Sequence, residues 1–429
     1  MAKVGVAIVG FGVIGTGVVE ILQKNRELIR NRTGVEIDLK TIVDIDIMTP
    51  RRVKPSPDVH FTTDYKEVIA DPEVDIVVEL VGGTGFALNL VEESLRAGKN
   101  VVTANKALLA EKSEAVFGLR NKVGKVIGFE ASVAGGIPII RTVTNALAAD
   151  NIKAICGIVN GTTNYILTKM SEENWDFQTA LKKAQELGFA EADPTLDIGG
   201  FDAAHKIAIL GALAFNCPIP YDKVYVEGID KVNLCDIKYA GEMGYVLKLL
   251  GIARIDDSDQ VEFRVHPTLL PNKHQLAAVR NEFNAVLIDS RYLGTSLYYG
   301  RGAGSLPTAT AVLADIISVG RSLDNPERSV KYNSFNNYAI KPMGEIESRY
   351  YLRFNVADQV GVLSKISGIF AEYNISISSV VQHEMKIENN VPLILTTHLA
   401  KEKNITSALD RIEKLDFSNG RGIMIRIME

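Results

Sequence analysis

A cluster of acidic residues followed by a lysine is the stretch of this sequence best suited to chemistry. Glu191, Asp197 and Asp202 lie within one short segment, and Lys206 follows Asp202 by four residues. The apolar residues after Lys206 predict a buried helix over Phe201–Phe215, whose spacing places both charges on one face. An exposed ion pair, worth only ~0.3–0.5 kcal/mol, is the alternative explanation. A charged pair at the start of a buried helix more often marks a functional site, and we adopt that interpretation.

These residue types suit the reduction of a carbonyl group. The carbonyl oxygen gains negative charge as a hydride reaches its carbon, so a proton donor must stand beside it. A lysine in a cleft can supply that proton, one carboxylate can orient the ammonium group, and others can hold a substrate ammonium group. The pattern therefore predicts an oxidoreductase with a small, amino-acid-like substrate, without identifying which one.

The N-terminus carries a dinucleotide-binding pattern. A glycine-rich motif follows an apolar strand and opens a helix, and its residues are Gly10, Phe11, Gly12, Val13, Ile14 and Gly15. The first glycine makes the turn, the second admits the pyrophosphate and the third allows close packing of helix and strand. The free N–H groups at the helix N-terminus then face the phosphates. An ordinary tight turn is the alternative.

The residues after the second predicted strand bear on the choice between NAD and NADP. Asp44 is placed to accept hydrogen bonds from the adenosine ribose, which favours NAD, although it lies further from the motif than the usual ~20 residues. Arg51 and Arg52 could instead hold a 2′-phosphate and permit NADP, or lie in a solvated turn. We expect both dinucleotides to be used, with NAD slightly preferred.

Two further strand ends point toward the same crevice, because ligands of open α/β sheets bind outside the carboxyl ends of the strands. One strand is followed by Gly82, Gly83 and Thr84; the other ends at Thr103, with Lys106 just beyond it. Cations are disfavoured at helix N-termini, so a lysine at this place favours a functional role over a surface position. We expect these residues to line the cofactor site.

Alternating apolar runs and amphipathic stretches predict the elements that position these groups. Up to residue 140, the predicted strands are Val4–Val9, Ile37–Val43, Asp75–Val81, Val101–Thr103 and Lys125–Phe129, and the predicted helices are Val13–Arg30, Phe86–Ala97 and Ala107–Asn121. Continuous apolar strands between helices predict a doubly wound α/β domain with a parallel sheet, a Rossmann-type fold. We expect a later helix, over residues 304–321, to return to this domain.

The rest of the chain predicts two more units. Residues 141–325 are typical of an α+β domain, assigned here to catalysis and dimerisation, with strands Ile152–Val159, Val261–Val265 and Ala285–Ile288 and helices Phe177–Leu187, Phe201–Phe215 and Leu234–Leu249. A polar linker, residues 326–348, leads to residues 349–429. There the strands Tyr350–Val356, Ile375–Met385, Leu393–Ala400 and Gly422–Ile427 and the helices Val362–Tyr373 and Ile405–Leu415 follow the βαββαβ order of a ferredoxin-like domain.

The segment around Lys206 resembles the signature of the homoserine dehydrogenase family. The matching positions are Ala184, Gly188, Phe189, Ala190, Asp193, Pro194, Asp197, Ile198, Gly200, Asp202 and Lys206. Residues 105–106, 130–138 and 160–164 are also similar, so the resemblance covers the whole chain. It implies the NAD(P)-dependent interconversion of L-aspartate 4-semialdehyde and L-homoserine, in the biosynthesis of threonine, methionine and isoleucine.

The resemblance also implies roles for individual residues. Lys206 would donate and accept the proton, with Lys106 near the reacting carbonyl. The substrate would be bound by Glu191, Asp197, Asp202, Gly161 and Thr162, and the cofactor would also contact Gly188, Gly302 and Gly304. A monovalent cation, Na⁺ or K⁺, would be held by Glu130 and the backbone carbonyls of Val133, Gly135 and Ile137. Without the resemblance, this last stretch is equally well a glycine-rich hinge.

The third unit resembles an ACT domain, in which the first strand–helix turn binds an amino acid at a dimer interface. The turn residues here are Asp358, Gln359, Gly361, Val362 and Leu363. Asp358 and Gly361 stand where the turn needs a helix cap and a residue that tolerates a tight backbone. The resemblance implies a homodimer or homotetramer inhibited by an amino acid, with L-threonine as the first candidate. A purely structural dimerisation module is the alternative.

Composition bears on several other classes. A net charge of −5 with dispersed charges argues against nucleic-acid binding, and no apolar run approaches the ~20 residues of a membrane span. The start of the chain runs into the glycine motif without a cleavage site, so we expect a buried strand rather than a signal peptide, and no fused aspartokinase before it.

The cysteines indicate a reducing compartment. Cys156, Cys217 and Cys235 are an odd number without metal-ligand spacing, so we expect a cytoplasmic protein. None has a recognisable nucleophile setting, which argues against aspartate-semialdehyde dehydrogenase, an enzyme that shares the substrate but forms a thioester on a cysteine. A catalytically silent regulator that binds an amino acid is the other alternative, and an activity assay separates the two.

Overall fold

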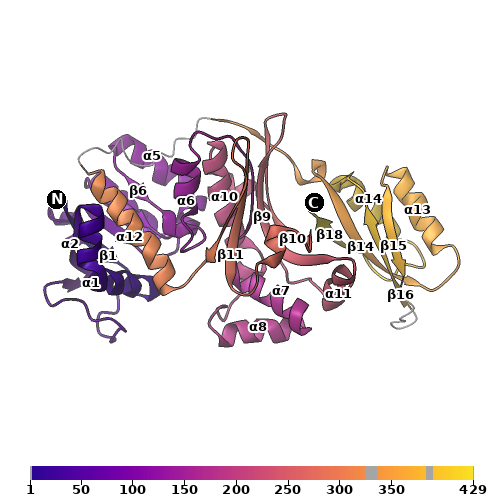
Figure 1. Cartoon of the computed structure of the whole chain (residues 1–429), viewed down its shortest axis with the longest axis horizontal. Helices are drawn as coiled ribbons and strands as arrows, with labels where there is room; N and C mark the ends of the chain where they lie inside the picture. Colours follow the sequence, from indigo (N-terminus) through magenta and orange to yellow (C-terminus); the bar gives the residue numbers. More distant parts are fainter. Residues whose placement is uncertain (1, 324–335, 383–389, 429) are drawn as a thin grey trace.

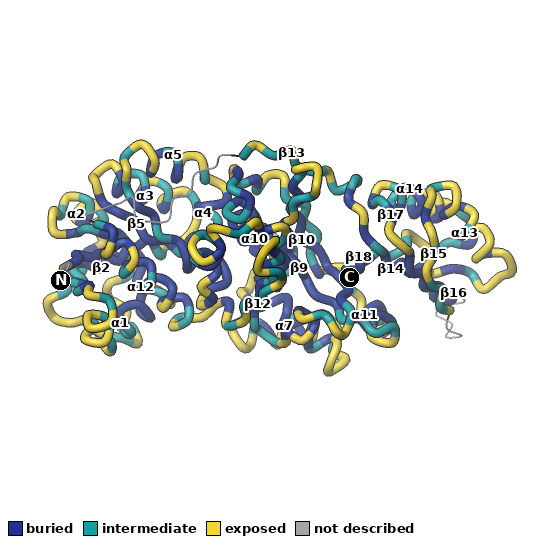
Figure 2. Tube along the Cα trace, turned by 45° about the horizontal axis from the view of Figure 1, so that its top comes forward, coloured by how far each residue is buried: buried dark blue, intermediate teal, exposed yellow. Residues whose placement is uncertain are grey.

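The computed structural model describes residues 2–323, 336–382 and 390–428. The chain runs along the long axis of the molecule in three parts, with the N-terminal part at one end, a mixed α/β part in the middle and the C-terminal part at the other end (Figure 1). Buried chain continues through all three parts (Figure 2). Among the helices of the described ranges, none combines the length and apolarity that crossing a bilayer requires.

The N-terminal part is built on a parallel sheet, as the sequence predicts. Its strands are β1 (Ala2–Val9), β2 (Val35–Val43), β3 (His60–Thr62), β4 (Ile76–Glu79), β5 (Asn100–Thr103) and β6 (Ile127–Gly128). They lie in the order β3-β2-β1-β4-β5-β6, and every pair is parallel. The order reverses beside β1, where a doubly wound sheet binds its ligand. The Rossmann-type fold is thereby confirmed.

Helices cover this sheet. They are α1 (Val13–Thr33), α2 (Tyr65–Ala70), α3 (Phe86–Arg96), α4 (Lys106–Glu111), α5 (Ser113–Val123) and α12 (Ser305–Arg321). The single helix predicted over residues 107–121 is wrong, because Lys112 leaves the helical region (φ −120°) and separates α4 from α5. The late helix α12 packs against α1, and a Cβ on Gly17 would lie 2.7 Å from Ser305 Oγ.

The middle part is a mixed sheet with helices on it. Its elements are α6 (Ile139–Arg141), β7 (Ile152–Ile158), α7 (Gly161–Glu173), α8 (Phe177–Glu186), α9 (Thr195–Ile198), α10 (Phe201–Phe215), β8 (Tyr225–Val226), α11 (Leu234–Glu242), β9 (Tyr245–Ile255), β10 (Gln260–Pro271), β11 (Phe283–Ser290) and β12 (Gly294–Arg301). The helix predicted over residues 234–249 is wrong in its second half. Gly244, in the left-handed region (φ +83°), stops the helix, and the apolar run beyond it pairs with β10 as strand β9.

The C-terminal part has the predicted βαββαβ order. Its elements are β14 (Glu347–Ala357), α13 (Val362–Glu372), β15 (Ile377–Gln382), β16 (Asn390–Thr397), the short β17 (Ala400–Lys401), α14 (Glu402–Ile412) and β18 (Ile423–Ile427). The end of the strand predicted over Ile375–Met385 lies outside the described residues. The four main strands run in the antiparallel order β18-β14-β16-β15, which confirms the ferredoxin-like fold.

One sheet joins the middle and C-terminal parts. Strand β18 pairs in parallel with β10, with Arg426 opposite Thr268 and Ile427 opposite Leu269. The described end of the predicted linker also belongs to this sheet, because β13 (Ala339–Ile340) pairs with β10. The C-terminal unit is therefore joined to the sheet of the middle part by backbone hydrogen bonds.

Candidate active site

The acidic cluster and the lysine meet at the start of α10. Gly200 caps this helix in the left-handed conformation (φ +85°), and a Cβ there would lie 3.2 Å from side-chain carbons of both Val226 and Val265. Only glycine fits such a conformation and such close packing. The tight start places Asp202 in the first turn and Lys206 one turn later, 6% and 9% exposed respectively. The predicted buried helix, Phe201–Phe215, is confirmed to the residue.

Two lysines flank one carboxylate. Lys206 Nζ donates to Asp202 Oδ2 at 2.7 Å and to the Val159 carbonyl at 2.7 Å. Lys106, at the start of α4, places its Nζ 3.2 Å from Asp202 Oδ1. Asn105 caps α4 by accepting a hydrogen bond from Leu108 N at 3.0 Å, which fixes the position of Lys106. The strand and helix ends thus bring together the two lysines that the sequence singles out.

Electrostatics keep this group charged. Burial by itself would raise the pKa of Asp202, but the charges of Lys206 and Lys106 hold it well below its usual range. Attraction to Asp202 in turn raises the pKa of Lys106, against the effect of its burial. Burial and the neighbouring Asp202 raise the pKa of Asp197. A buried anion beside two ammonium groups is therefore the resting state of the site.

Asn160 joins the two carboxylates, and the sequence reasoning did not assign it to the site. Its Nδ2 donates to Asp197 Oδ1 at 2.6 Å and to Asp202 Oδ2 at 2.8 Å, while its Oδ1 accepts from Thr163 N at 2.8 Å as the cap of α7. An asparagine directly after a strand and before a helix is a recognisable capping signal. The second role, holding two carboxylates, depends on packing that the local sequence does not contain.

The remaining substrate candidates lie around this group. Gly161 begins α7, and a Cβ there would lie 2.6 Å from the Glu282 carbonyl oxygen. Thr162 Oγ1 donates to the Phe189 carbonyl at 2.6 Å, so the hydroxyl fastens the loop before Glu191. Glu191 is exposed and acts on Lys106 through its charge. Gly188, predicted at the cofactor, is an exposed left-handed residue (φ +74°) just after α8, in this same loop.

The glycine-rich motif is packed as a dinucleotide turn requires. Gly10 is left-handed (φ +103°), and a Cβ there would lie 2.7 Å from the Leu80 carbonyl oxygen. A Cβ on Gly15 would lie 2.3 Å from the Gly10 carbonyl oxygen. Gly12 precedes α1, which begins with Val13 and Ile14. Phe11 is buried, and its N–H donates to Asp44 Oδ2 at 2.6 Å.

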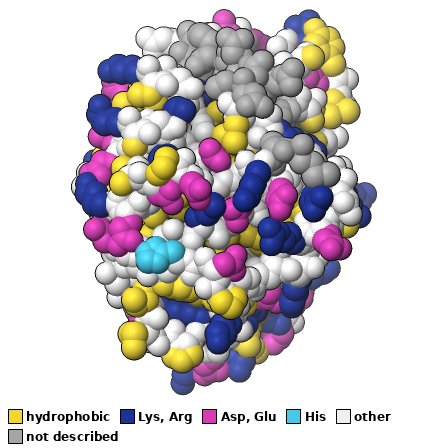
Figure 3. Space-filling view, turned by 90° about the vertical axis from the view of Figure 1, so that its left-hand side faces the viewer, with side chains coloured by type: hydrophobic (Ala, Val, Ile, Leu, Met, Phe, Trp, Pro, Cys, Tyr) yellow, Lys and Arg dark blue, Asp and Glu magenta, His cyan; other side chains and the backbone are white. Residues whose placement is uncertain are grey.

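Arg51 and Arg52, the two arginines predicted to bind a 2′-phosphate, have different carboxylate partners. Arg51 NH2 lies 3.8 Å from Asp44 Oδ1 and 3.4 Å from Asp46 Oδ2, at the end of β2. Arg52 NH2 is bound to Glu20 Oε2 at 2.7 Å, on α1. Arg51 alone therefore stands beside Asp44. Basic and acidic side chains are interspersed on this end of the molecule rather than gathered by sign (Figure 3).

A buried glutamate orders the neighbouring strand ends, and the sequence reasoning missed it. Glu79 ends β4 and accepts hydrogen bonds from Val81 N and Gly82 N, each at 3.0 Å, and from the Thr103 hydroxyl at 2.5 Å. Asn105 Nδ2 donates to the Gly83 carbonyl at 2.7 Å. The only sequence signal was a charged residue at the end of an apolar strand. Gly82 and Gly83 are left-handed (φ +77° and +71°), followed by half-buried Thr84.

The loop before α12 closes on the glycine motif. Ser305 Oγ donates to the Val13 carbonyl at 2.6 Å. Gly304 adopts φ +116°, which favours glycine, and a Cβ on Gly302 would lie 2.0 Å from the Asn284 side chain. These contacts bring the loop that carries Gly302 and Gly304 beside the start of α1.

The candidate cation segment, residues 130–138, packs tightly on the same loop. Gly135 is left-handed (φ +51°), and a Cβ there would lie 2.5 Å from the Gly302 carbonyl oxygen. The Glu130 carboxylate accepts from Ile140 N at 2.8 Å and Arg141 N at 3.0 Å. Burial, together with the neighbouring Asp315, raises the pKa of Glu130 to about 7.

The oxygen atoms of residues 130–138 are the donors that a bound cation would use. Each Glu130 carboxylate oxygen accepts one backbone hydrogen bond and keeps a second lone pair for a cation. In the described ranges, no three His, Cys, Asp or Glu side chains form a metal-binding cluster. The Glu130 carboxylate and the backbone carbonyls of Val133, Gly135 and Ile137 are hard oxygen donors, the type that suits a monovalent cation.

The turn between β14 and α13, where the sequence predicts effector-binding residues, is tight. Gly361 is left-handed (φ +91°) and caps α13, and Gln359 N donates to the Ala357 carbonyl at 2.9 Å. Val362 is buried, whereas Leu363 is 42% exposed and Val360 fully so. Asp358, on the same turn, is exposed. Exposed apolar residues beside a left-handed glycine leave this turn open to a ligand or a partner.

The cysteines do not form a thiol centre. Burial raises the pKa of Cys156 and of Cys217 to about 11, and burial also raises the pKa of Cys235. A nucleophilic thiol needs the opposite shift. These environments argue against a thioester mechanism.

Three family models match successive parts of the chain. Residues 10–130 match the model described as "Homoserine dehydrogenase, NAD binding domain", residues 138–317 match "Homoserine dehydrogenase", and residues 350–417 match "ACT domain". The dinucleotide-binding domain, the dehydrogenase domain and the ACT domain expected from the sequence are thereby confirmed.

Whole proteins and solved structures agree. The homoserine dehydrogenase of Neisseria gonorrhoeae is 43% identical over 100% of this chain and 99% of that protein, and that of Bacillus subtilis is 40% identical over 97% and 96%. The crystal structure of a homoserine dehydrogenase from Thiobacillus denitrificans has a TM-score of 0.93 at 40% identity, covering 100% of this chain and 98% of that one. A hyperthermophilic archaeal homoserine dehydrogenase mutant, solved in complex with NADPH, has a TM-score of 0.63 at 27% identity over 75% and 98%.

The buried lysine–carboxylate group, the glycine-rich turn and the full-length similarity to these enzymes lead to one assignment. The chain belongs to the homoserine dehydrogenase family, as an NAD(P)-dependent oxidoreductase that carries a C-terminal ACT domain.

Proposed function

We propose that Lys206 transfers the proton in the interconversion of L-aspartate 4-semialdehyde and L-homoserine. The observation that carries this role is the position of its ammonium group, which is buried between the Asp202 carboxylate and the Val159 carbonyl. Asp202 holds the ammonium in place, so one N–H remains for a substrate oxygen. Lys106, on the other side of Asp202, adds positive charge where the oxygen becomes an alkoxide.

The substrate roles follow from the same group. The bound dinucleotide supplies or accepts the hydride at the carbonyl carbon. Glu191 and Asp197 provide negative charge for the substrate ammonium group, and the start of α7, at Gly161 and Thr162, borders them. Asn160 keeps Asp197 and Asp202 at a fixed separation. The site thus distinguishes the amino end of the substrate from its reacting end.

Both NAD and NADP fit the dinucleotide site in this proposal. Asp44 lies where a ribose 2′-hydroxyl is recognised, but its oxygens also accept hydrogen bonds from Phe11 N and Asp46 N. Arg51 beside it offers a partner for a 2′-phosphate. The NADPH complex of the archaeal relative supports the second use. Gly82, Gly83, Thr84, Gly188, Gly302 and Gly304 complete the proposed surface.

Three further features complete the proposal. Glu130 and the backbone carbonyls of Val133, Gly135 and Ile137 hold a Na⁺ or K⁺ ion at the junction of the first two units. The turn at residues 358–363 binds an amino acid, with L-threonine the first candidate, and the bound amino acid lowers activity.

The enzyme is a cytoplasmic homodimer or homotetramer in the threonine, methionine and isoleucine pathway. The exposed Tyr299 and Leu297 on edge strand β12 are the support for self-association through the middle sheet.

The first test compares initial rates of NAD(H)- and NADP(H)-linked turnover for the wild type and Lys206→Ala. We expect a loss of at least about a hundredfold in kcat, with dinucleotide binding retained, because the variant removes only the proton carrier. Lys24→Ala is the control, since Lys24 forms an exposed i,i+4 pair with Glu20. No turnover of L-homoserine by the wild type would sink the proposal and favour a silent amino-acid-binding regulator.

A further inference from the structure

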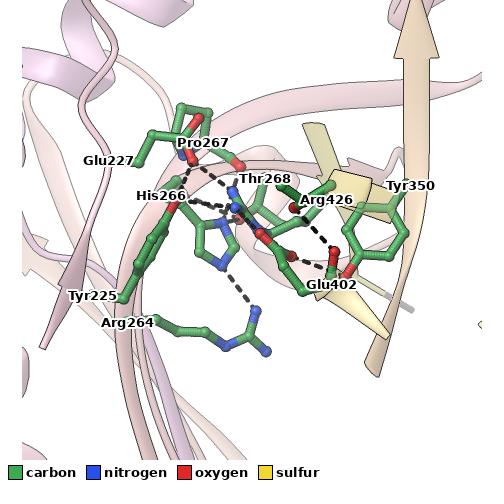
Figure 4. A network of polar contacts seen from close by, with 10 residues as sticks. Tyr225, Glu227, Arg264, His266, Pro267, Thr268, Tyr350, Glu402 and Arg426 are labelled. Atoms are coloured by element: carbon green, nitrogen blue, oxygen red, sulfur yellow. Dashed lines mark hydrogen bonds and ion pairs between the residues drawn. The ribbon is translucent and has the colours of Figure 1, made fainter. Parts of the chain in front are cut away.

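A buried arginine of the C-terminal domain reaches into the catalytic domain. Arg426, on β18, is 1% exposed and lies between two carboxylates (Figure 4). Its NH1 donates to Glu227 Oε2 at 2.7 Å, and its Nε donates to Glu402 Oε2 at 3.0 Å. The hydroxyl of Tyr225 donates to Glu227 at 3.0 Å, and that of Tyr350 donates to Glu402 at 2.9 Å. Arg426 therefore connects α14 of one domain with the residue that follows β8 of the other.

A second arginine binds the same stretch of the catalytic domain. Arg353, on β14, donates from Nε to Asp236 Oδ1 at 2.6 Å and from NH2 to Asp236 Oδ2 at 3.0 Å. Tyr351 OH donates to the same carboxylate at 3.0 Å. Asp236 is on α11, nine positions after Glu227. The C-terminal domain thus holds both ends of residues 227–236, which we call the bridging segment.

The middle of the bridging segment packs on the turn that carries Asp197. Ile229 N donates to the Ile198 carbonyl at 2.7 Å. A Cβ on Gly228 would lie only 2.2 Å from that same oxygen, so the two backbones are in direct contact. Ile198 follows Asp197 on α9, and Asp197 is tied to the catalytic group through Asn160. A movement of Glu227 therefore reaches Asp197 through rigid backbone contacts.

We infer that Arg426 is a positioning residue for the dehydrogenase site, acting through Glu227 and the bridging segment on Asp197. The inference rests on the proposed role of Asp197 in binding the substrate. Glu227 is on the partly exposed side of the network, with 35% of its side chain accessible. Water can therefore replace Arg426 as the hydrogen-bond donor to its carboxylate. Arg426 is kept inside by Glu402, which belongs to the C-terminal domain. Rearrangement of that domain then changes the affinity of the dehydrogenase site for its amino-acid substrate.

The variant that tests this is Glu227→Ala in the full chain. Removing Arg426 itself would leave Glu402 buried without its partner and endanger folding. We expect the KM for L-homoserine to rise about tenfold, while kcat and the KM for the dinucleotide stay within about twofold. Glu227→Gln keeps an oxygen acceptor for Arg426 and should recover most of the loss. The control is Glu372→Gln, which removes a carboxylate from an exposed pair with Arg411 and should change neither constant.

A double-mutant cycle decides whether the effect passes through Asp197. In an Asp197→Asn background, Glu227→Ala should raise the KM for L-homoserine by less than about twofold, because the positioned group is already lost. Multiplication of the two effects, or an unchanged KM in the single variant, would overturn the inference and leave the proposed function standing. A wild type without L-homoserine turnover would overturn both.

Discussion

The residues of the candidate active site are held in place by hydrogen-bond partners that they share. Lys206 and Asp202 are predictable from sequence because a separation of four residues is a local property of a helix. Asn160 and the Val159 carbonyl contact Asp202 and Lys206 from a different strand and helix, so no local sequence pattern predicts these contacts. Glu79 binds the nearby Val81 N and Gly82 N, but its contact with the Thr103 hydroxyl, at the end of another strand, has no local signal either. What the sequence cannot supply is the tertiary packing that makes these residues neighbours.

The shared amide of Asn160 gives a prediction at this scale. Asn160→Ala should lower kcat/KM for L-homoserine by about a hundredfold, because Asp197 and Asp202 would lose their common donor and repel each other. The KM for the dinucleotide should stay unchanged, as measured by steady-state kinetics. Asp176→Ala removes a comparable cap, from α8, at an exposed position. A loss below about threefold in Asn160→Ala would argue against this role.

At the scale of elements, the sequence predicts strands and helices where the apolar period is unambiguous. The parallel sheet and α10 were predicted because their apolar runs are flanked by glycine turns or charged caps. The sequence predicts one helix over residues 234–249, but β9 begins at Tyr245. A strand buried on both faces has no alternation to distinguish it from a buried helix, and a single glycine such as Gly244 does not by itself predict the end of a helix. Pairing with β10 determines that the residues from Tyr245 onward form a strand.

A buried lysine on β9 gives a prediction about stability. Lys248 is 2% exposed, donates to Asn164 Oδ1 at 3.0 Å, and has its pKa lowered by burial to about 8. Between pH 8 and the usual pKa of 10.5, the unfolded chain holds this proton and the folded chain does not, so stability should rise with pH across that window. Below pH 8 both states are protonated, and the contribution is constant.

Urea unfolding at pH 7.5 and pH 9.5 measures this effect. The free energy of unfolding of Lys248→Met should lack the rise, whose slope is at most ~1.4 kcal/mol per pH unit for one proton. Lys182→Met, which removes an exposed lysine, should keep the wild-type profile. Parallel profiles for wild type and Lys248→Met would contradict the prediction.

At the scale of the whole molecule, the C-terminal domain is part of the catalytic structure rather than an appendage. The βαββαβ order was predictable from its own sequence, but its attachment was not. Strand β18 pairs with β10, more than a hundred residues away, and no pattern in either strand specifies that neighbour. Two buried arginines then hold the domain to the bridging segment.

The pair of Arg353 and Asp236 gives a prediction about the stability of this joint. Arg353→Met should lower the free energy of unfolding by about 3–5 kcal/mol, because it leaves the Asp236 charge buried without its cation. Arg353→Met combined with Asp236→Leu should recover part of that loss, since no isolated charge remains. Arg411→Met, at an exposed pair, should cost less than about 1 kcal/mol. Equal losses in the two single arginine variants would contradict this account of the joint.

The return of α12 to the N-terminal domain has a consequence for folding during synthesis on the ribosome. About 160 residues separate the end of α6 from the start of α12, which covers α1 and β6. At a synthesis rate of roughly 5–20 residues per second, the nascent first domain waits roughly ten to thirty seconds for that helix. During this interval the apolar surface beneath α12 is open to chaperones, and the glycine turn lacks the Ser305 contact that closes it. The contact between the loop before α12 and the glycine turn therefore forms only once most of the chain has been translated.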